Sequence, residues 1–328
     1  MLRYDGRVAL ITGSTAGVGK AYAELLGSRG AKVIINCRKE NDAAHAVVNN
    51  IKASGGEALI VAGDVRKAET IQAMVDTAID AWGRIDIAIS NAAAPIETAL
   101  PSGNVAETID DGFNVHVRST LRMNSLVWPY MEKQGYGRLL ATGSAGGTGY
   151  IALPGGYYVD YALCKSSMFG LIRQTAAHGK PYNITCNMVM PWAYTKMVDE
   201  SIGGTELGLW MEANQRPEQV AAAIAPLLHE DCPVTGEAIT AGGGRVGRIF
   251  FAATRGIFDR NLTPEESLER WDEIMGTTAP DGTLLDVFEQ TQPREEGVMG
   301  STLMKGELPS LTEIVKMPLK GGSMSMDN

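Results

Sequence analysis

Short apolar, often β-branched runs alternate with longer amphipathic stretches over the first 241 residues of the chain. Most of these runs are continuously apolar, which is typical of parallel strands covered by helices on both faces. Parallel strands joined through helices are connected by right-handed crossovers. We therefore predict an α/β fold with a doubly wound parallel sheet of seven strands, at Val8–Thr12, Val33–Cys37, Ala58–Ala62, Ile85–Ser90, Arg138–Thr142, Ile184–Met190 and Glu237–Thr240.

The chain beyond Gly244 departs from this alternation. It begins with an apolar and basic stretch and continues into a predicted helix, which Thr263 caps and in which Glu266 completes a capping box. We predict one domain over residues 1–244 and a C-terminal extension over 245–328. The extension is expected to pack on the domain or on a partner subunit and to end in a weakly ordered tail.

The overall charge and composition exclude several classes of function. The net charge is −9, so a nucleic-acid partner has no electrostatic support. No apolar stretch is long enough for a membrane span, and the N-terminus does not read as a secretory signal. The cysteines and histidines are scattered without metal-ligand spacing, so we expect free thiols, no metal site and a cytoplasmic protein.

A glycine-rich turn follows the first predicted strand. It reads TGSTAGVG and leads directly into a predicted helix. Glycines bring backbone N–H groups close to a pyrophosphate, and the helix N-terminus adds a favourable dipole. The spacing is GxxxGxG rather than the standard GxGxxG. We predict that a dinucleotide is bound by Gly13, Ser14, Thr15, Gly17, Val18 and Gly19.

Further candidates for cofactor contacts follow the third and fourth predicted strands. Ligands of an open parallel sheet bind outside the carboxyl ends of its strands. Asp64 is expected to accept a hydrogen bond from the adenine amine, with Val65 beside it. Asn91 is expected to stabilise the strand end that the cofactor crosses, together with Ala92.

Tyr161 and Lys165 are four residues apart, on one face of a predicted helix. A neighbouring ammonium is expected to lower the pKa of the phenol towards useful acid–base range. Ser144 follows the fifth strand and is expected to bind the substrate oxygen. In this order the residues predict an oxidoreductase that moves a hydride between a nicotinamide and a carbonyl or alcohol carbon, with Tyr161 as acid and base.

These motifs resemble those of the short-chain dehydrogenase/reductase family, since TGSTAGVG, SNAA, Ser144 and YALCK occur in that family's order. Within it, the chain is similar over about residues 1–275 to the (3R)-hydroxyacyl-CoA dehydrogenase domains of peroxisomal multifunctional enzymes of type 2. The resemblance implies a Rossmann-type fold and a homodimer or homotetramer built through helices near 112–134 and 159–180. It further implies that the cofactor is contacted by Tyr161, Lys165, Pro191 and Thr195.

Two departures from the family pattern bear on catalysis. His116 stands where the family usually has a catalytic asparagine, so the resemblance implies a catalytic position for His116 with an altered proton-relay water. The stretch between Ser144 and Tyr161 is longer than usual, which predicts an enlarged loop over 145–157 that reshapes the substrate site.

The choice of nicotinamide depends on the end of the second strand. Relatives that prefer NAD carry an acidic residue at the position of Cys37, where this chain has none. Arg38 is instead expected to pair with a 2′-phosphate. We predict NADP(H) as the favoured cofactor, with NAD(H) as the alternative that the resemblance to multifunctional enzymes supports.

The substrate is left open by the sequence. The resemblance implies a 3-hydroxyacyl-CoA or 3-oxoacyl-CoA, with arginines 245, 248, 255 and 260 as candidates for its phosphates. The segment after Pro191 predicts a substrate lid containing Trp192, Tyr194 and Met197, which suits a steroid or other cyclic ketone equally. The alternative from another class is a catalytically idle NADP-binding sensor or scaffold.

Overall fold

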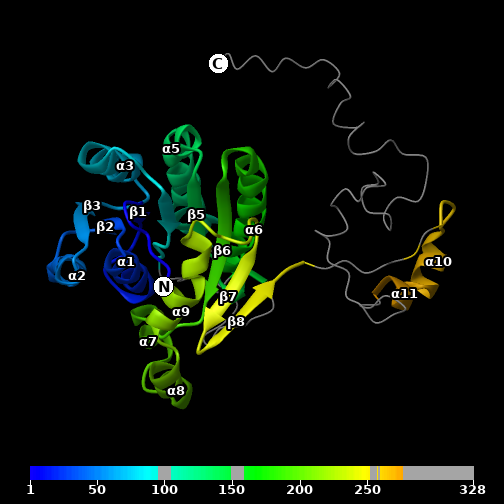
Figure 1. Cartoon of the computed structure of the whole chain (residues 1–328). Helices are drawn as coiled ribbons and strands as arrows, with labels where there is room; N and C mark the ends of the chain where they lie inside the picture. The colour runs from blue at the N-terminus through cyan, green and yellow to red at the C-terminus, as the bar shows by residue number, and fades with distance from the viewer. Residues whose placement is uncertain (95–104, 149–158, 252–256, 258, 276–328) are drawn as a thin grey trace. The chain divides into compact units, whose positions relative to one another are not determined.

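The computed structural model describes residues 1–94, 105–148, 159–251, 257 and 259–275. Its sheet has the strand order β3-β2-β1-β4-β5-β6-β7-β8 (Figure 1). The first seven strands in the chain are parallel, and β8 pairs with β7 in the antiparallel sense. The strands are β1 (Val8–Ile11), β2 (Lys32–Cys37), β3 (Glu57–Ala62), β4 (Ile87–Ser90), β5 (Gly137–Thr142), β6 (Ile184–Pro191), β7 (Ala238–Gly242) and β8 (Arg245–Ile249).

Two layers of helices cover the sheet, as the continuously apolar strands require. Val8 and Leu10 of β1 point into one core and Ala9 and Ile11 into the other. The first core is closed by α3 (Ala68–Trp82), α5 (Ser119–Gln134) and α6 (Val159–Gly179). The second is closed by α1 (Gly17–Ser28), α2 (Asp42–Ala53) and α9 (Pro217–Ile224). The doubly wound fold is therefore confirmed.

The remaining elements are short. The helix α4 (Val105–Phe113) continues through a π-helical turn at Asn114–Arg118 into α5. Single 3-10 turns cover Ala145–Thr148, Lys180–Tyr182 and Ala225–Leu228. After β6 come α7 (Lys196–Ile202) and α8 (Glu206–Asn214).

The predicted sheet of seven strands was one strand short. Residues of the predicted extension form β8, whose Ile249 lies opposite Ala238 of β7. Glycines 242 to 244 all have positive φ and make the tight turn between the two strands. The first compact unit therefore ends at Ile249.

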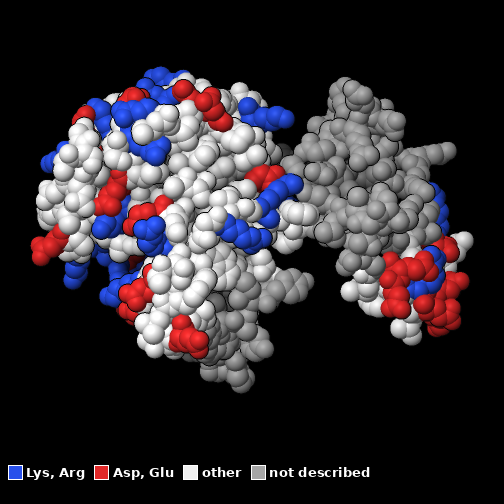
Figure 2. Space-filling view, turned by 60° about the horizontal axis from the view of Figure 1, so that its bottom comes forward, with Lys and Arg blue, Asp and Glu red and all other residues white. Residues whose placement is uncertain are grey.

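The second unit begins at Phe250. Its described part contains α10 (Pro264–Glu269) and α11 (Trp271–Met275), and the predicted capping box of Thr263 and Glu266 is present. Acidic side chains gather on this segment, whereas acidic and basic ones are interspersed on the visible face of the first unit (Figure 2). The predicted weakly ordered tail lies outside the described residues.

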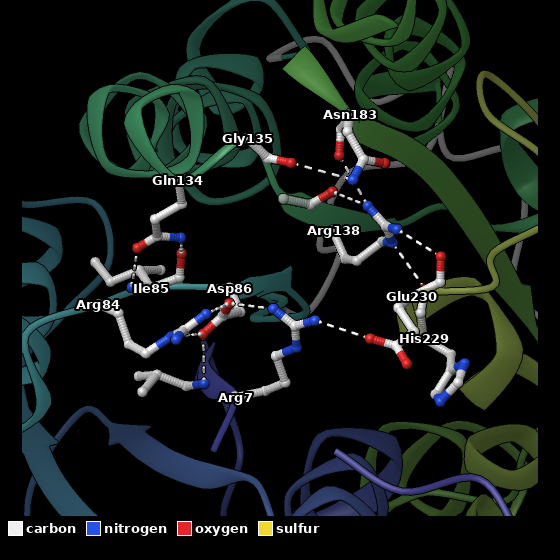
Figure 3. Close-up of polar contacts among 12 residues, drawn as sticks. Arg7, Arg84, Ile85, Asp86, Gln134, Gly135, Arg138, Asn183, His229 and Glu230 are labelled. Carbon is white, nitrogen blue, oxygen red and sulfur yellow. Dashed lines mark hydrogen bonds and ion pairs between the residues drawn. The ribbon is translucent and has the colours of Figure 1, made fainter. Parts of the chain in front are cut away.

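A cluster of charges, of which Asp86 and Arg138 are buried, joins the amino-terminal ends of the strands (Figure 3). Asp86, which is fully buried, accepts hydrogen bonds from Arg7, from Arg84 and from the backbone N–H of Val8. Arg138 at the start of β5 is also buried and donates only to backbone carbonyls, among them those of His229 and Glu230. The cluster links β1, β4, β5 and the segment before β7 at the edge of the sheet opposite the predicted site.

Candidate active site

The predicted site residues meet at the carboxyl edge of the sheet, where the strand order reverses between β1 and β4. Thr12 at the end of β1 accepts hydrogen bonds through its hydroxyl from the backbone N–H groups of Asn91 and Ala92. The Asn91 side chain in turn donates to the carbonyls of Thr12 and Gly13. The predicted role of Asn91 in stabilising this strand end fits these contacts.

The glycine turn leaves no room for side chains. A Cβ at Gly19 would lie 2.3 Å from the Gly13 carbonyl oxygen, and one at Gly13 would lie 2.9 Å from Cα of Ala92. Gly13 and Gly17 also have positive φ values. The residue before α1, Ala16, makes no side-chain cap, so the first N–H groups of the helix stay available to a ligand. This cradle fits a cofactor pyrophosphate.

Asn36, which was not among the predicted site residues, holds this turn in place. Its side chain accepts from the backbone N–H of Gly13 and donates to the carbonyls of Val61 and Gly63, so that it joins the ends of β1, β2 and β3. Ser14 is fully buried, and its hydroxyl donates to Ile11 and accepts from the N–H of Asn36. Both functions of the Ser14 hydroxyl therefore serve the fold, and the predicted cofactor contact of Ser14 stays a prediction.

We expect Gly19→Ala to weaken NADPH binding by at least tenfold, because the added methyl group meets the Gly13 carbonyl and the Asn91 amide. Fluorescence titration of the cofactor measures the effect. Gly170→Ala is the matched control, since a Cβ there meets no atom within 4 Å. Equal affinities of the two variants would contradict the placement of the pyrophosphate.

Asp64, the predicted adenine contact, already has a charged partner, Arg66. The Asp64 carboxylate accepts from Arg66, which lowers the pKa of Asp64, and Arg66 also pairs with Asp111 of α4. Asp64 is therefore already bound by a guanidinium, which was not expected. Arg38 is exposed directly after β2, as the predicted contact with a 2′-phosphate requires.

Two predicted cofactor contacts have their side chains in the hydrophobic cores. Val65 packs in the first core and Val18 in the second. Only their backbone atoms are left to face a ligand. Thr195, in contrast, lies directly against the glycine turn, because a Cβ at Gly17 would be 3.2 Å from its methyl group. Thr195, a predicted cofactor contact, and Gly17, a predicted phosphate contact, are thus neighbours.

A π-helical turn brings His116 into the site. The wider turn changes the backbone hydrogen bonding, and the hydroxyls of Ser119 and Thr120 donate to the carbonyls of Val115 and His116. The ring of His116 meets the ring of Tyr161 edge-on, with 5.7 Å between centroids. His116 is only 4% exposed, and burial together with the charge of Lys165 lowers its pKa to about 2.

The three predicted catalytic side chains lie together beside His116. Ser144 hydrogen-bonds Tyr161, and the Ser144 hydroxyl accepts from the N–H of Gly146 at 3.1 Å. Lys165 Nζ lies 5.5 Å from the centroid of the Tyr161 ring and donates to the carbonyl of Thr142 at 2.7 Å. Gly147 packs against the backbone of Lys165, which fixes the turn after Ser144 on α6.

The acid–base balance of the site differs from the expected one. Burial raises the pKa of Tyr161, and the hydrogen bond with Ser144 only partly opposes this rise. The predicted lowering of this pKa by Lys165 is wrong for the free chain, because the ammonium is directed at Thr142. Burial lowers the pKa of Lys165 itself to about 8. Lys165 is therefore poised to exchange a proton near neutral pH.

The neutral state of His116 predicts a loss of stability in acid. The pKa of His116 is about 2 in the folded chain and about 6.5 in an unfolded one, so only the unfolded chain takes up this proton between the two values. The free energy of unfolding should fall by about 1.4 kcal/mol for each pH unit below about 6 on account of this group.

Urea unfolding at several acidic pH values measures this slope. His116→Asn should flatten it by that amount, whereas His45→Asn, at an exposed histidine, should not. Parallel slopes for the wild type and His116→Asn would show that His116 becomes charged in the folded chain.

The two ends of the predicted lid are hydrogen-bonded to each other. The N–H of Tyr194 donates to the carbonyl of Gln215 at 2.6 Å, which joins the start of the segment to its end after α8. Gly242 packs directly on the carbonyl of Trp192, and Gly243 on the side chain of Gln215. Trp192 and Met197 are exposed by 44% and 36%, and the Tyr194 hydroxyl donates to Asp199.

Some predicted features lie outside the described residues, and one predicted phosphate contact has another partner. Part of the enlarged loop, residues 149–158, and Arg255 lie outside the described residues. Arg248 pairs with Glu237 of the same unit, so it is not free to bind a phosphate of CoA. Arg260 belongs to the second unit. In the described parts of the chain, no helix is long and apolar enough to cross a bilayer, and all four cysteines are free.

Comparison with known proteins supports the resemblance that the motifs predicted. Residues 7–203 match the family described as short chain dehydrogenase. The chain is 33% identical to the peroxisomal multifunctional enzyme type 2 of Mus musculus, over 83% of this chain and 37% of that protein. It is also 33% identical to the peroxisomal hydratase-dehydrogenase-epimerase of Neurospora crassa, over 85% of this chain and 31% of that protein. The chain thus spans about a third of the length of these relatives.

Solved structures agree with the fold. The full-length multifunctional enzyme type 2 of Drosophila melanogaster matches with a TM-score of 0.69 and 27% identity, over 88% of this chain and 48% of that chain. A short chain dehydrogenase of Burkholderia cenocepacia in complex with NADP matches with a TM-score of 0.65 and 28% identity, over 74% of this chain and 98% of that chain.

Proposed function

Because the chain belongs to the short-chain dehydrogenase/reductase family and is therefore an NAD(P)-dependent oxidoreductase, we propose that it acts with NADP(H) on a 3-oxoacyl-CoA or the corresponding 3-hydroxyacyl-CoA. The observation that carries this proposal is the grouping of Ser144, Tyr161 and Lys165 next to the glycine cradle. The acyl-CoA class rests on the sequence resemblance to multifunctional enzymes.

Each catalytic side chain has a distinct role in the proposed reaction. When bound, the nicotinamide supplies or accepts the hydride. In the reducing direction, Ser144 holds the substrate oxygen by a hydrogen bond and Tyr161 delivers a proton to it. Lys165 then returns a proton to Tyr161, as its pKa of about 8 allows. The ammonium also has two further N–H donors for the cofactor ribose, since Thr142 takes only one.

The preference for NADP(H) is proposed on charge. Arg38 and Lys39 are both exposed after β2, and no carboxylate stands at Cys37 to repel a phosphate. We expect Arg38→Ala to reduce kcat/KM for NADPH by about tenfold or more, with little change for NADH. Lys52→Ala removes an exposed charge from α2 and serves as the control. A variant that affects both cofactors equally would argue against a 2′-phosphate contact.

A homodimer or homotetramer is proposed through α5 and α6. Leu121 of α5 and Leu163 of α6 are each 48% exposed in the single chain. Large apolar side chains that are exposed in one subunit are typical of residues that a second subunit covers. Sedimentation velocity tests this assembly. The cytoplasmic location predicted from the sequence stays a prediction, since the relatives named above carry the word peroxisomal in their names.

The test of the function is the change in absorbance of NADPH and NADH with purified protein and three substrates: a 3-oxoacyl-CoA, a steroid ketone and a simple cyclic ketone. Turnover of the thioester alone supports the proposal. Turnover of the cyclic ketones alone supports the second candidate, which the exposed Trp192 and Met197 of the lid favour. Cofactor binding without turnover would support the idle sensor or scaffold.

A further inference from the structure

The loop between β3 and α3 contacts the helix that carries His116 on both sides of its π-helical turn. The guanidinium of Arg66 pairs with Asp111 of α4, with 2.7 Å between Nη1 and the carboxylate oxygen. The backbone carbonyl of Arg66 accepts a hydrogen bond from Arg122 of α5 at 3.3 Å. Since Asp111 precedes the turn Asn114–Arg118 and Arg122 follows it, one residue of the loop is joined to the helix before and after His116.

Arg66 is also bound to Asp64, the predicted contact of the adenine amine. The N–H of Arg66 donates to Asp64 Oδ1 at 2.9 Å, Nε lies 3.0 Å and 3.1 Å from the two carboxylate oxygens, and Nη2 donates to Oδ2 at 2.5 Å. A carboxylate offers about four acceptor positions. An adenine amine can therefore donate to Asp64 only if it displaces at least one of the contacts that Arg66 makes.

A guanidinium displaced from Asp64 has a second anionic partner within reach. Asp111 already accepts from Nη1 of Arg66, and its side chain is 57% exposed, so its carboxylate has acceptor positions left for a further N–H. Binding of an amine at Asp64 therefore favours a closer pair between Arg66 and Asp111. The change at Asp64 is passed to α4 in this way.

The turn that Arg66 adjoins lies beside the catalytic phenol. The ring of His116 meets the ring of Tyr161 edge-on, with 5.7 Å between centroids. Val115 and Val117, the neighbours of His116, are buried in the same core as Val65, which precedes Arg66 in the loop. A shift of the loop therefore bears on the turn through an ion pair and through a common core.

We propose that Arg66 is a positioning residue, which couples binding of the cofactor's adenine at Asp64 to the placement of the π-helical turn beside Tyr161. The inference rests on the proposed function. Binding energy from the remote end of the cofactor is thereby used at the reacting end. Exposed ion pairs contribute little one by one, so the expected coupling is modest, about fivefold.

Amide hydrogen exchange with adenosine diphosphate tests the coupling without turnover, because this probe is the half that NAD(H) and NADP(H) share. At saturating probe, exchange at Asn114–Arg118 should slow by about fivefold in the wild type and stay unchanged in Arg66→Gln. Residues 13–19 should be protected in both, which shows that the probe is bound. Arg3→Gln is the matched control, since Arg3 makes a similar ion pair with Asp5, two residues further on.

The reaction gives a second readout. The rate of hydride transfer in a single turnover is measured with the whole cofactor and with reduced nicotinamide mononucleotide, which lacks the adenine. We expect the whole cofactor to react about fivefold faster in the wild type and in Arg3→Gln. The ratio should fall to about one in Arg66→Gln and in Asp111→Asn, which leaves the pair of Asp64 and Arg66 intact. A variant that is merely unstable would lower both rates by the same factor.

The proposal is overturned if Arg66→Gln keeps the protection of the turn when adenosine diphosphate binds, or if it keeps the wild-type ratio of the two rates. Absence of protection at residues 13–19 in the wild type, or full activity of Tyr161→Phe, would instead overturn the proposed function. The two failures are therefore distinguishable.

Discussion

Tyr161→Phe is expected to lower kcat by about 100- to 10,000-fold, the usual contribution of a positioned general acid. The substitution removes only the phenolic oxygen, which Ser144 hydrogen-bonds and which burial keeps protonated in the free chain. Binding of NADPH should change little, because the glycine cradle is untouched. Single-turnover measurements at saturating cofactor separate the chemical step from binding.

Tyr182→Phe is the matched control for this experiment. Tyr182 lies just after the carboxyl-terminal end of α6, whereas Tyr161 lies in its first turn, so the control makes the same chemical change away from the site. Its activity should equal that of the wild type. If Tyr161→Phe were equally active, the proton donor would have to be another group, and the roles of Ser144 and Lys165 would need to be reassigned.

Asp86→Asn is expected to lower the free energy of unfolding by about 1–3 kcal/mol, because it breaks the hydrogen bonds that a fully buried carboxylate makes, while both partner arginines are partly exposed. The substitution keeps the shape of the side chain but removes the charge that holds Arg7 and Arg84 at 3.0 Å and 2.6 Å. It also places an amide nitrogen among groups that are all donors (Figure 3). Urea unfolding followed by circular dichroism measures the loss.

The control for this experiment is Asp80→Asn, at an exposed position of α3. It makes the same chemical change without a buried partner and should alter stability by less than about 0.5 kcal/mol. Because the cluster lies at the edge of the sheet opposite the site, the folded fraction of Asp86→Asn should keep its cofactor affinity. A stability equal to that of the wild type would mean that solvent or a neighbouring group compensates both arginines.

The parallel core of the fold could be predicted from the sequence because its signal is local. Strands such as β2 are apolar on both faces, and only a parallel sheet between two helical layers buries both. The strand β8 was missed for the opposite reason. Its residues read RVGRI and are largely exposed, so their pairing with β7 depends on three glycines with positive φ rather than on an apolar pattern.

Residue types and spacing predicted which side chains gather in the site but not what each of them binds. Spacing along a helix placed Tyr161 and Lys165 on one face, yet the direction of the ammonium depends on the carbonyl of Thr142, which is brought near only by tertiary packing. Asn36 was missed although a polar residue in the apolar run KVIINC is a usable signal. The position of Ser14 in the turn does not reveal that Asn36 and Ile11 occupy its hydroxyl.

The hydrogen bond between Tyr194 and Gln215 makes the segment between them a separable insert. Since its two ends are fixed to each other and to the β7–β8 turn, changes in length or composition within α7 and α8 do not have to propagate into the sheet. Chains of this architecture can thus exchange the insert and retain their catalytic residues. The set of substrates can therefore change while the catalytic residues stay the same. Replacing the segment between Tyr194 and Gln215 with that of a relative is a practical way to change substrate specificity.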